Sequence, residues 1–581
     1  MTAPLRIRRR EPVPGGDWPD AVPPLLRRLY AMRGALSPEQ ARPRLSALAA
    51  PDGLLGLEGA VALLAGAIAR DARIVVVGDF DCDGATAQAV GVRGLRLLGA
   101  RHVAHAVPNR MVHGYGLSPA LVDELAALRP DLLVTVDHGI ACHAGIAAAK
   151  ARGWTVVVTD HHLPGERLPP ADAIVDPSLP GDAFPSKALA GVGVMFYVLL
   201  ALRARLRRSG AFGAGAEPDL SALLDLVAIG TVADLVPLDL NNRALVGAGL
   251  RRLRAGQGHA GLRALIRAAG RDESRLCAAD IGFAIGPRLN AAGRLEDMSL
   301  GIELLLCDEP AAARRMAEAL EQINAERRAV QQVMTDDAER AVARAGLAAE
   351  SGLPAALCLF DADWHPGVVG LVASKIKERL HRPTVAFAPA EPGLDAPMAG
   401  ALRGSARSIP GFHVRDALAA LDAAHPGLIE RFGGHAMAAG LSLPGAHLDA
   451  FREAWHAHAA AHLDPALLQA ELLTDGELLP QEFDRAHAEL LRDAGPWGQG
   501  FPEPLFDGEF EVLDARAVGG RHLKLVLRHP GLREPLQAIR FGGWTGERTP
   551  GRVRLAYRLA PDDYRGGQAV QLLVEALQPA D

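Results

Sequence analysis

The chain has 581 residues, which is long enough for about three or four domains with cores of their own. Hydrophobic residues make up 49% and charged residues 22%, so the composition excludes a fibrous or largely disordered protein. The net charge of −6 gives no overall attraction to nucleic acid, and any such binding must come from local basic patches.

The N-terminal segment, residues 1–70, is predicted to be an extension that packs on the lobe following it. Four arginines lie within residues 6–10, but no apolar stretch follows them, so we expect no secretory signal. The five cysteines are far apart and form no CxxC pair, which argues against a disulfide framework and a structural zinc site. A cytoplasmic location follows as the expectation.

Residues 73–177 alternate between short runs of β-favouring residues and helical stretches. This alternation predicts a parallel, doubly wound sheet, in which ligands bind beyond the carboxyl ends of the strands. Asp79, Asp137 and Asp160 each end an apolar run. Three predicted strands therefore bring carboxylates to one edge of the sheet.

The first of these strands is followed by the motif GDFDCDG, in which Asp79, Asp81 and Asp83 occupy every second position. Carboxylates this close repel one another, so the arrangement favours hard divalent cations as partners. On this motif alone, a solvated acidic turn that caps the next helix is an equally good interpretation.

The rest of the chain predicts three further parts. Residues 187–307 are mainly helical, and the apolar run 188–202 is shorter than the roughly 20 residues that cross a bilayer, so a buried core helix without membrane contact is expected. Residues 309–350 predict one long linker helix, with a coiled-coil dimer as the competing interpretation; Arg327 and Asp337 break the heptad and favour the linker. A second α/β lobe at 351–462 and a β-barrel with an OB-fold at 463–581 complete the prediction.

Further acidic and imidazole groups occur in TVDHG (Asp137), TDHH (Asp160, His161 and His162) and VADLVP (Asp234). Taken singly, each has a structural interpretation, such as a helix cap for Asp160 or a satisfied core imidazole for His161. Together, oxygen ligands with imidazole and without thiolate suit a pair of Mn²⁺ or Mg²⁺ ions. Two such ions can activate a water and stabilise the leaving oxygen in phosphoryl transfer.

The order GDFDCDG, TVDHG, TDHH and VADLVP resembles the DHH family of phosphoesterases. The resemblance implies a DHH catalytic domain at 71–308 and a DHHA1-type lobe at 351–462. It implies that Asp137 bridges the two ions, that His162 contacts the scissile phosphate or protonates the leaving group, and that Asp160 orients the neighbouring imidazole. The metal ligands it implies are Asp81, Asp83, Asp137, His161 and Asp234, with Asp79 as a less certain one.

Five other segments resemble the RecJ family of bacterial exonucleases: PNRMVHGYGL, GPRLNAAGR, DWHPGVVGLVASKIKERLHRP, GSARSIPGFH and RFGGHAMAAGLSL. This resemblance implies 5′→3′ degradation of single-stranded DNA to 5′-mononucleotides in DNA repair and recombination. It also implies a single-strand-binding protein and a RecQ-type helicase as partners of a monomer. Phe80, Cys82 and His138 depart from the family pattern, but none is an implied ligand, and a buried, inert thiol is expected for Cys82.

Several residues of these segments can bind the strand. Arginine forks, hydroxyls and the glycine backbone suit phosphate oxygens, and aromatic rings such as Tyr115 and Trp364 can stack on bases. Surface ion pairs, tight turns and core packing are the structural alternatives. The predicted substrate contacts are Asn109, Arg110, Tyr115, Arg288, Asn290, Ser405, Arg407, Gly434 and His435, and Arg521, His522, Lys524, Arg528 and Arg540 predict a basic groove on the barrel.

Two other functions fit parts of this pattern. A DHH enzyme for small substrates, such as a dinucleotide phosphodiesterase or a pyrophosphatase, is generally much shorter and would not need the β-rich C-terminal part. A non-catalytic replication scaffold would have lost metal ligands, whereas every implied ligand position is filled in this chain.

Overall fold

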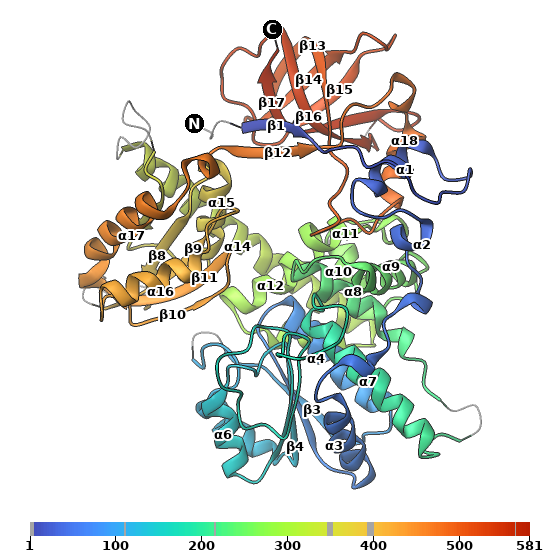
Figure 1. The fold of residues 1–581 in the computed structure, drawn as a ribbon, viewed down its shortest axis with the longest axis vertical. Helices are drawn as coiled ribbons and strands as arrows, with labels where there is room; N and C mark the ends of the chain where they lie inside the picture. Colours follow the sequence, from blue (N-terminus) through green and yellow to red (C-terminus); the bar gives the residue numbers. More distant parts are fainter. Residues whose placement is uncertain are drawn as a thin grey trace. The chain divides into compact units, whose positions relative to one another are not determined.

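The computed structural model describes residues 5–109, 112–213, 217–344, 353–391, 400–563 and 565–580. The fold divides into two compact units (Figure 1). The large unit comprises residues 10–324 and 475–581, and the small unit comprises residues 325–474 with the N-terminal strand.

The large unit contains a five-stranded sheet in the order β3-β2-β4-β5-β6, and all its neighbouring strands are parallel. This confirms the parallel, doubly wound sheet predicted from the alternating pattern. The strands are β2 (Ile74–Gly78), β3 (Val103–Ala106), β4 (Leu132–Val136), β5 (Thr155–Thr159) and β6 (Ala173–Val175).

Both faces of this sheet are buried. Ile74 and Val76 of β2 belong to one apolar cluster, and Val75 and Val77 belong to another on the opposite face, as the period of two requires. The covering helices are α3 (Leu57–Ala69), α4 (Cys82–Leu97), α5 (Pro119–Leu125), α6 (His143–Ala151) and α7 (Gly191–Arg208).

The apolar run 188–202 forms most of α7, and its residues from Val192 to Leu199 are buried, as expected for a core helix. Within the described ranges, no single helix is long and apolar enough to cross a membrane. One bent pair, 45–53 with 57–69, meets the criterion only as a pair that turns through 93°.

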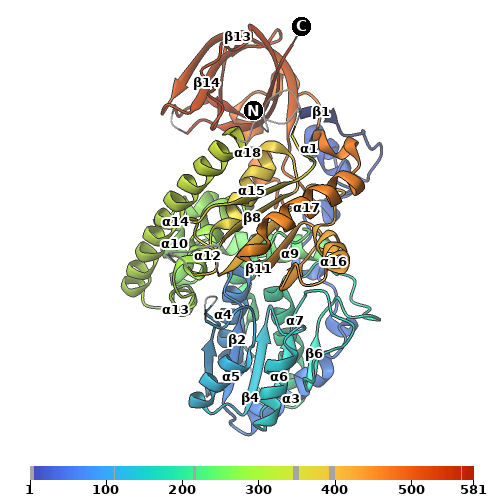
Figure 2. The ribbon, with the colours of Figure 1, turned by 90° about the vertical axis from the view of Figure 1, so that its left-hand side faces the viewer.

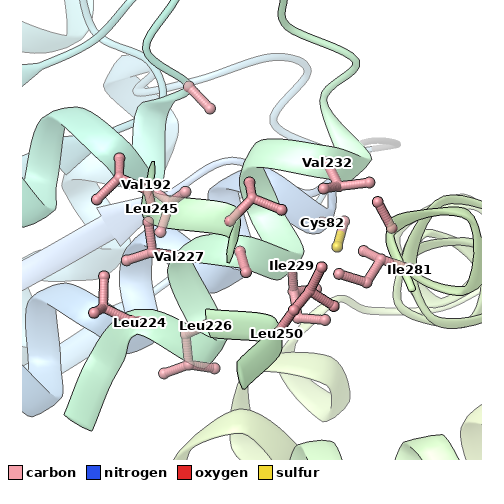
Figure 3. Close-up of a cluster of buried hydrophobic side chains, with 14 of the residues drawn as sticks. Cys82, Val192, Leu224, Leu226, Val227, Ile229, Val232, Leu245, Leu250 and Ile281 are labelled. Carbon is pink, nitrogen blue, oxygen red and sulfur yellow. The ribbon is translucent and has the colours of Figure 1, made fainter. Parts of the chain in front are cut away.

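A helical layer follows the sheet along the chain and contributes Val232, Leu250 and Ile281 to the same buried cluster as Cys82 (Figure 3). Its elements are α8 (Leu224–Ala233), α9 (Leu240–Arg254), α10 (Ala260–Ala268), α11 (Ala278–Asp280), a π-helical turn (Ile281–Ile285), α12 (Gly286–Leu295), α13 (Ser299–Leu306) and α14 (Pro310–Arg344). The predicted long helix is thus α14 as far as Arg344, and the boundary between the two units falls within it, after Asn324.

The small unit contains a five-stranded mixed sheet in the order β10-β11-β9-β8-β7, in which only β7 and β8 are parallel. Helices α15 (Val369–Leu380), α16 (Val414–Ala424) and α17 (Leu448–His462) belong to this unit. The strands are β7 (Leu357–Phe360), β8 (Thr384–Pro389), β9 (Ala401–Arg407), β10 (Arg431–Gly434) and β11 (Ala438–Pro444).

The N-terminal extension is divided between the units. Strand β1 (Leu5–Arg9) pairs in parallel with β12 (Ala470–Thr474) in the small unit. Helices α1 (Pro24–Ala31), α2 (Pro38–Ala41) and α3 lie in the large unit. Tyr30 of α1 donates to the carbonyl of Ala494 at 2.8 Å, so α1 contacts the segment before the barrel, whereas α3 shares an apolar core with the parallel sheet.

The C-terminal residues form the closed barrel that the sequence predicts (Figure 2). Its strand order is β13-β14-β15-β17-β16, and β15 pairs with β17 in parallel while the other pairs are antiparallel. The elements are α18 (Arg485–Asp493), β13 (Phe506–Val518), β14 (His522–Arg528), β15 (Leu536–Arg540), β16 (Arg552–Pro561) and β17 (Val570–Pro579).

Candidate metal centre

Three strands of the parallel sheet end in buried carboxylates. Asp79 follows β2, Asp137 follows β4 and Asp160 follows β5, and they are 4%, 2% and 1% exposed. The pairing of β2 with β4 and of β4 with β5 aligns these strand ends at one edge. The prediction that this edge gathers acidic groups is therefore met by the fold itself.

Seven side chains converge at this edge in three overlapping sets whose ligand atoms lie within 4.8 Å of one another. His161 Nε2 lies 3.1 Å from Asp137 Oδ1 and 3.5 Å from Asp234 Oδ2, so Asp137 and His161 each take part in two sets. Carboxylate oxygens with imidazole are the donors that Mn²⁺ and Mg²⁺ accept. The sets are Asp79 with Asp81 and Asp137, Asp83 with His161 and Asp234, and Asp137 with His161 and His162.

Asp81 and Asp83 are positioned by helix starts. Asp81 is the N-cap of α4, and one of its oxygens accepts a hydrogen bond of 3.0 Å from the Gly84 amide. Asp83 accepts hydrogen bonds from the amides of Gly191 at 2.6 Å and Val192 at 3.0 Å, at the start of α7. The capping interpretation of the sequence therefore holds for Asp81, and it leaves the second oxygen of that carboxylate available to a cation.

Gly191 allows α7 to start directly against the acidic edge. A Cβ atom at this position would lie 2.5 Å from both Cβ and Oδ1 of Asp137, closer than any two such atoms can approach. The sequence analysis did not identify Gly191 as part of the site. Its only signal was a glycine at the start of a core helix, a pattern that also occurs in helices far from any functional site.

The carboxylate of Asp160 accepts several hydrogen bonds. Its Oδ2 accepts from the Ile140 amide at 2.9 Å, and its Oδ1 accepts from the His161 amide at 2.8 Å and from Nδ1 of His162 at 2.7 Å. The aspartate thereby fixes the loop that carries both histidines and the orientation of the His162 ring.

The same contact sets the charge of His162. Burial alone would lower the pKa of this imidazole, but the hydrogen bond and charge of Asp160 raise it to about 9. Burial alone would likewise raise the pKa of Asp160, and the contacts with His162 outweigh it and hold that pKa well below its usual range. His162 is therefore a cation near neutral pH and can donate a proton or a hydrogen bond to an oxyanion.

In the absence of a cation, the ionised form of the carboxylates in the cluster is unfavourable. Burial, with repulsion from neighbouring carboxylates, raises the pKa of Asp137 and Asp234 well above the usual range and that of Asp83 to about 7. Oδ1 of Asp137 is buried and accepts no hydrogen bond from the described residues. A divalent cation fits these donors because its charge offsets the repulsion between the carboxylates and because Oδ1 of Asp137 is available to coordinate it.

We expect the metal-free protein to lose stability as the pH rises between about 4 and about 7. Asp83 has a folded pKa of about 7, above its unfolded value of about 3.9, so the folded state binds more protons in this window. Thermal unfolding in EDTA at pH 5 and pH 7.5 measures the effect. Because other groups titrate as well, Asp83→Asn is the matched control, and an equal pH dependence of both proteins would contradict the prediction.

The nearby predicted substrate contacts have different environments. Asn290 Oδ1 accepts a hydrogen bond of 2.7 Å from the amide of Cys82, which lies between Asp81 and Asp83. Tyr115 is 51% exposed, and its ring packs edge-on against His162 with the centroids 6.2 Å apart. Asn109 Oδ1 accepts from the Val112 amide at 3.3 Å, and Arg110 lies outside the described residues.

Two other predicted contacts are buried. Arg288 is 8% exposed and contacts Glu321 of α14 and the carbonyl of Ala284, which occupies much of its guanidinium within the large unit. Trp364 is 3% exposed, so the expectation that it stacks on bases is wrong, and the alternative of core packing applies.

The small unit brings Ser405, Arg407, Gly434 and His435 together. Arg407 lies opposite Ala438 in the pairing of β9 with β11, and β11 pairs in turn with β10, which ends at Gly434. Nη1 of Arg407 donates to Ser405 Oγ and to the carbonyl of Ala406, each at 2.8 Å. Burial lowers the pKa of Arg407, and no described carboxylate forms an ion pair with it. A partly buried guanidinium without a carboxylate partner among the described residues is suited to a phosphate.

Sequence reasoning missed Asp176, which ends strand β6 and is fully buried. Its Oδ1 accepts from the Ser178 amide at 2.7 Å, and Ser178 Oγ donates to the carbonyl of His161 at 2.9 Å. Burial raises the pKa of Asp176 to about 7. The signal was present in the sequence, because ADAIVD ends in an aspartate just as the other predicted strands do.

Comparison with known proteins places this geometry in a family. Residues 73–231 match the DHH family, N-terminal domain, residues 352–460 match the DHHA1 domain, and residues 474–576 match the RecJ OB domain. The single-stranded-DNA-specific exonuclease RecJ of Dickeya dadantii is 50% identical over 98% of this chain and 99% of its own length. The chain belongs to the RecJ family.

Two solved RecJ structures from Thermus thermophilus share the fold. The one in complex with Mn²⁺ has a TM-score of 0.79 and 32% identity, and the alignment covers 99% of this chain and 80% of that one. The one in complex with Mg²⁺ has a TM-score of 0.74 and 30% identity, covering 99% of this chain and 79% of that one.

The departures from the RecJ pattern lie around the predicted ligands. Phe80 packs edge-on against Tyr115, with ring centroids 6.0 Å apart. The Cys82 thiol is buried, and burial followed by the charges of Asp81 and Asp83 raises its pKa well above the usual range, in keeping with the inert thiol that we expected. His138 is buried with its Nε2 3.0 Å from the Val77 carbonyl.

Proposed function

We propose that this protein is a metal-dependent exonuclease that degrades single-stranded DNA from its 5′ end to 5′-mononucleotides in DNA repair and recombination. The observation that carries the proposal is the convergence of Asp137 and His161 with the other acidic groups in overlapping ligand sets. Membership of the RecJ family supports the choice of single-stranded DNA as substrate, because its relatives bear that name.

The proposed ligands of two Mn²⁺ or Mg²⁺ ions are Asp81, Asp83, Asp137, His161 and Asp234, with Asp137 shared between the ions and Asp79 in a supporting place. When bound, the ions would supply Lewis-acid chemistry, lowering the pKa of a water and neutralising charge on the phosphate. Asp83 is held by the amides at the start of α7 and Asp81 by its cap of α4, so the donors are fixed before substrate arrives.

Side chains of the protein donate the proton for the reaction and bind the DNA strand. His162, charged and oriented by Asp160, donates to an oxygen of the scissile phosphate or to the leaving oxygen. Tyr115 offers an exposed ring beside His162 for the terminal base. In the small unit, Arg407 with Ser405 binds a phosphate of the strand, and the backbone at Gly434 and His435 completes that surface.

The barrel offers a further contact that the sequence did not predict. Phe541 is 66% exposed directly after β15, and its ring packs edge-on against His522 at a centroid distance of 5.3 Å. His522, Lys524 and Arg540 belong to the predicted basic groove, whereas Arg528 pairs with Glu511 at 2.9 Å. An exposed aromatic ring among basic groups suits the stacking of a base.

Replacing this ring tests the role of the barrel. We expect Phe541→Ala to weaken the binding of single-stranded DNA by about 1–3 kcal/mol, because one base loses its stacking partner. Fluorescence anisotropy with a labelled oligonucleotide in EDTA measures the change. Val518→Ala, at an exposed apolar position on the barrel, is the control. Unchanged affinity of the Phe541 variant would show that Phe541 does not contribute to the binding of single-stranded DNA.

The proposed reaction is tested with 5′- and 3′-labelled single- and double-stranded DNA, each with Mn²⁺, Mg²⁺ or EDTA. The expected result is release of a labelled mononucleotide from the 5′ end of single strands only, with a divalent ion and not with EDTA. Preference for the dinucleotide pApA over oligonucleotides would instead indicate an enzyme for small substrates. Cleavage from the 3′ end would refute the polarity.

The proposal includes a monomeric enzyme that works with a single-strand-binding protein and a RecQ-type helicase. These partners come from the family resemblance. Light scattering of the purified protein checks the monomer, and co-sedimentation with each candidate partner checks the associations.

A further inference from the structure

A cavity of about 540 Å³ lies within the large unit, next to the segment that carries Asp234. Its walls come from the C-terminal end of α8, from α9, from the π-helical turn and from residues 492–503. None of the predicted metal ligands lines it. Its volume lies in the range of small-molecule sites, about 300–1,000 Å³.

The charged residues that line the cavity are mainly arginines, set in a largely apolar wall. Among the described residues that line it, the one carboxylate is Glu503, which lies 3.0 Å from Arg558. Nε of Arg254 donates to the carbonyl of Leu276 at 2.7 Å. The lining arginines are Arg42, Arg243, Arg251, Arg254, Arg492 and Arg558.

Arg251 and Arg42 carry the least compensated charges of this cluster, although Asp493, which pairs with Arg492, also acts electrostatically on Arg42. Neither forms an ion pair or a side-chain hydrogen bond with a described residue. Burial, followed by the charges of Arg42, Arg44 and Arg254, lowers the pKa of Arg251. Guanidinium groups held this close repel one another, and an anion that accepts hydrogen bonds from several of them relieves the repulsion.

The rest of the cavity wall is apolar, and this limits the class of anion that the cavity can bind. Phe283 is 84% exposed and projects from the π-helical turn Ile281–Ile285. Leu235, 71% exposed, adds to the apolar lining. An aromatic ring exposed to this extent beside an arginine cluster suits a ligand that joins a flat base to a phosphate, and π-helical turns frequently occur at functional sites.

We propose that this cavity is a second nucleotide site, which binds a nucleoside 5′-monophosphate with its phosphate on Arg42 and Arg251 and its base on Phe283. The choice of a monophosphate rests on the proposed function, of which it is the product. A nucleotide within the DNA strand carries the same chemistry and is the other source of the ligand.

The site also touches the segment that holds a predicted metal ligand. Val232, Ala233 and Leu235, on either side of Asp234, line the cavity. Val232 and Leu250 belong, with Cys82, to one buried apolar cluster (Figure 3). A nucleotide in the cavity therefore packs on the end of α8, directly beside Asp234.

Calorimetric titration of the protein in EDTA with dAMP tests the proposal, since no hydrolysis occurs without metal. We expect Arg251→Gln to weaken dAMP binding about ten- to a hundredfold and Phe283→Ala about five- to a hundredfold. Deoxyadenosine and inorganic phosphate, which each lack half of the ligand, are expected to bind at least about tenfold more weakly than dAMP. Arg267→Gln, an exposed arginine of α10 outside the cavity, is the matched control and should bind as the wild type does.

A non-hydrolysed (dT)12 oligonucleotide separates the two sources. If dAMP still binds to oligonucleotide-saturated protein, the free nucleotide is the ligand; if the oligonucleotide displaces dAMP and Arg251→Gln weakens both, the strand supplies the phosphate. Unchanged affinity for both ligands in Arg251→Gln and Phe283→Ala, with melting temperatures like that of the wild type, would overturn the second site. Absence of nuclease activity with intact, Arg251-dependent dAMP binding would instead reject the proposed function alone.

Discussion

Replacing Asp137 is expected to reduce nuclease activity by about a thousandfold or more while the fold is retained. Asp137 belongs to two of the three ligand sets and lies 3.1 Å from His161, so its loss removes the shared oxygen donor. The assay is digestion of 5′-labelled single-stranded DNA with Mn²⁺.

Comparing two substitutions at Asp137 distinguishes the loss of the carboxylate from an effect on the backbone conformation. Asp137 has a positive φ of 62°, a conformation that asparagine tolerates better than alanine. Both Asp137→Asn and Asp137→Ala should be inactive. In EDTA, the asparagine variant should unfold at a higher temperature than the wild type, because a buried carboxylate whose pKa is raised by burial and repulsion has been made neutral.

Asp20→Asn, at a fully exposed carboxylate, is the control and should change neither property. Undiminished digestion by the Asp137 variants under Mn²⁺ would refute the shared-ligand assignment. A lower melting temperature of Asp137→Asn in EDTA would refute the account of its electrostatic strain.

The second large effect is expected at Gly191. In Gly191→Ala the new methyl carbon would lie 2.5 Å from Cβ and Oδ1 of Asp137, so helix α7 or the end of β4 must move. Overpacking of this kind costs about 1–3 kcal/mol of the free energy of unfolding. Because Asp83 is held by the amides of Gly191 and Val192, the same movement displaces a ligand, and we expect activity to fall about a hundredfold.

Gly193→Ala in the same helix is the matched control. Its Cβ would meet the flexible side chain of Leu189 at 3.1 Å, and alanine is favoured over glycine within a helix by about 1 kcal/mol. Denaturant unfolding and the nuclease assay compare the two variants. Equal behaviour of Gly191→Ala and Gly193→Ala would show that the close approach of α7 to Asp137 is not required.

Local sequence patterns predicted the elements well. The alternation of apolar runs and helical stretches gave the parallel sheet, and the runs of alternating residues after 505 gave the closed barrel. In both parts the pattern is set by burial, which repeats every second residue in strands and about every third or fourth in helices. The mixed pairing of the second sheet was not predicted, because strand direction depends on connections that local pattern does not encode.

The candidate site was predictable to the extent that its residues end strands. Asp79, Asp137 and Asp160 gather because parallel strands align their carboxyl ends. Asp176 ends a strand in the same way and was overlooked. Arg288 was predicted as a substrate contact and Trp364 as either a stacking or a core residue, and their burial, against Glu321 in the case of Arg288, depends on packing between distant segments.

The sequence by itself determined the residue types at the metal centre and their order along the chain, because Mn²⁺ and Mg²⁺ favour carboxylate and imidazole donors. Only the tertiary structure decided how these donors are held. The amides at the start of α7 bind Asp83, Gly191 admits the helix beside Asp137, and the arginines around the second cavity come from segments far apart in the chain. Such contacts depend on the packing of distant segments within ångströms, which no local pattern of residues specifies.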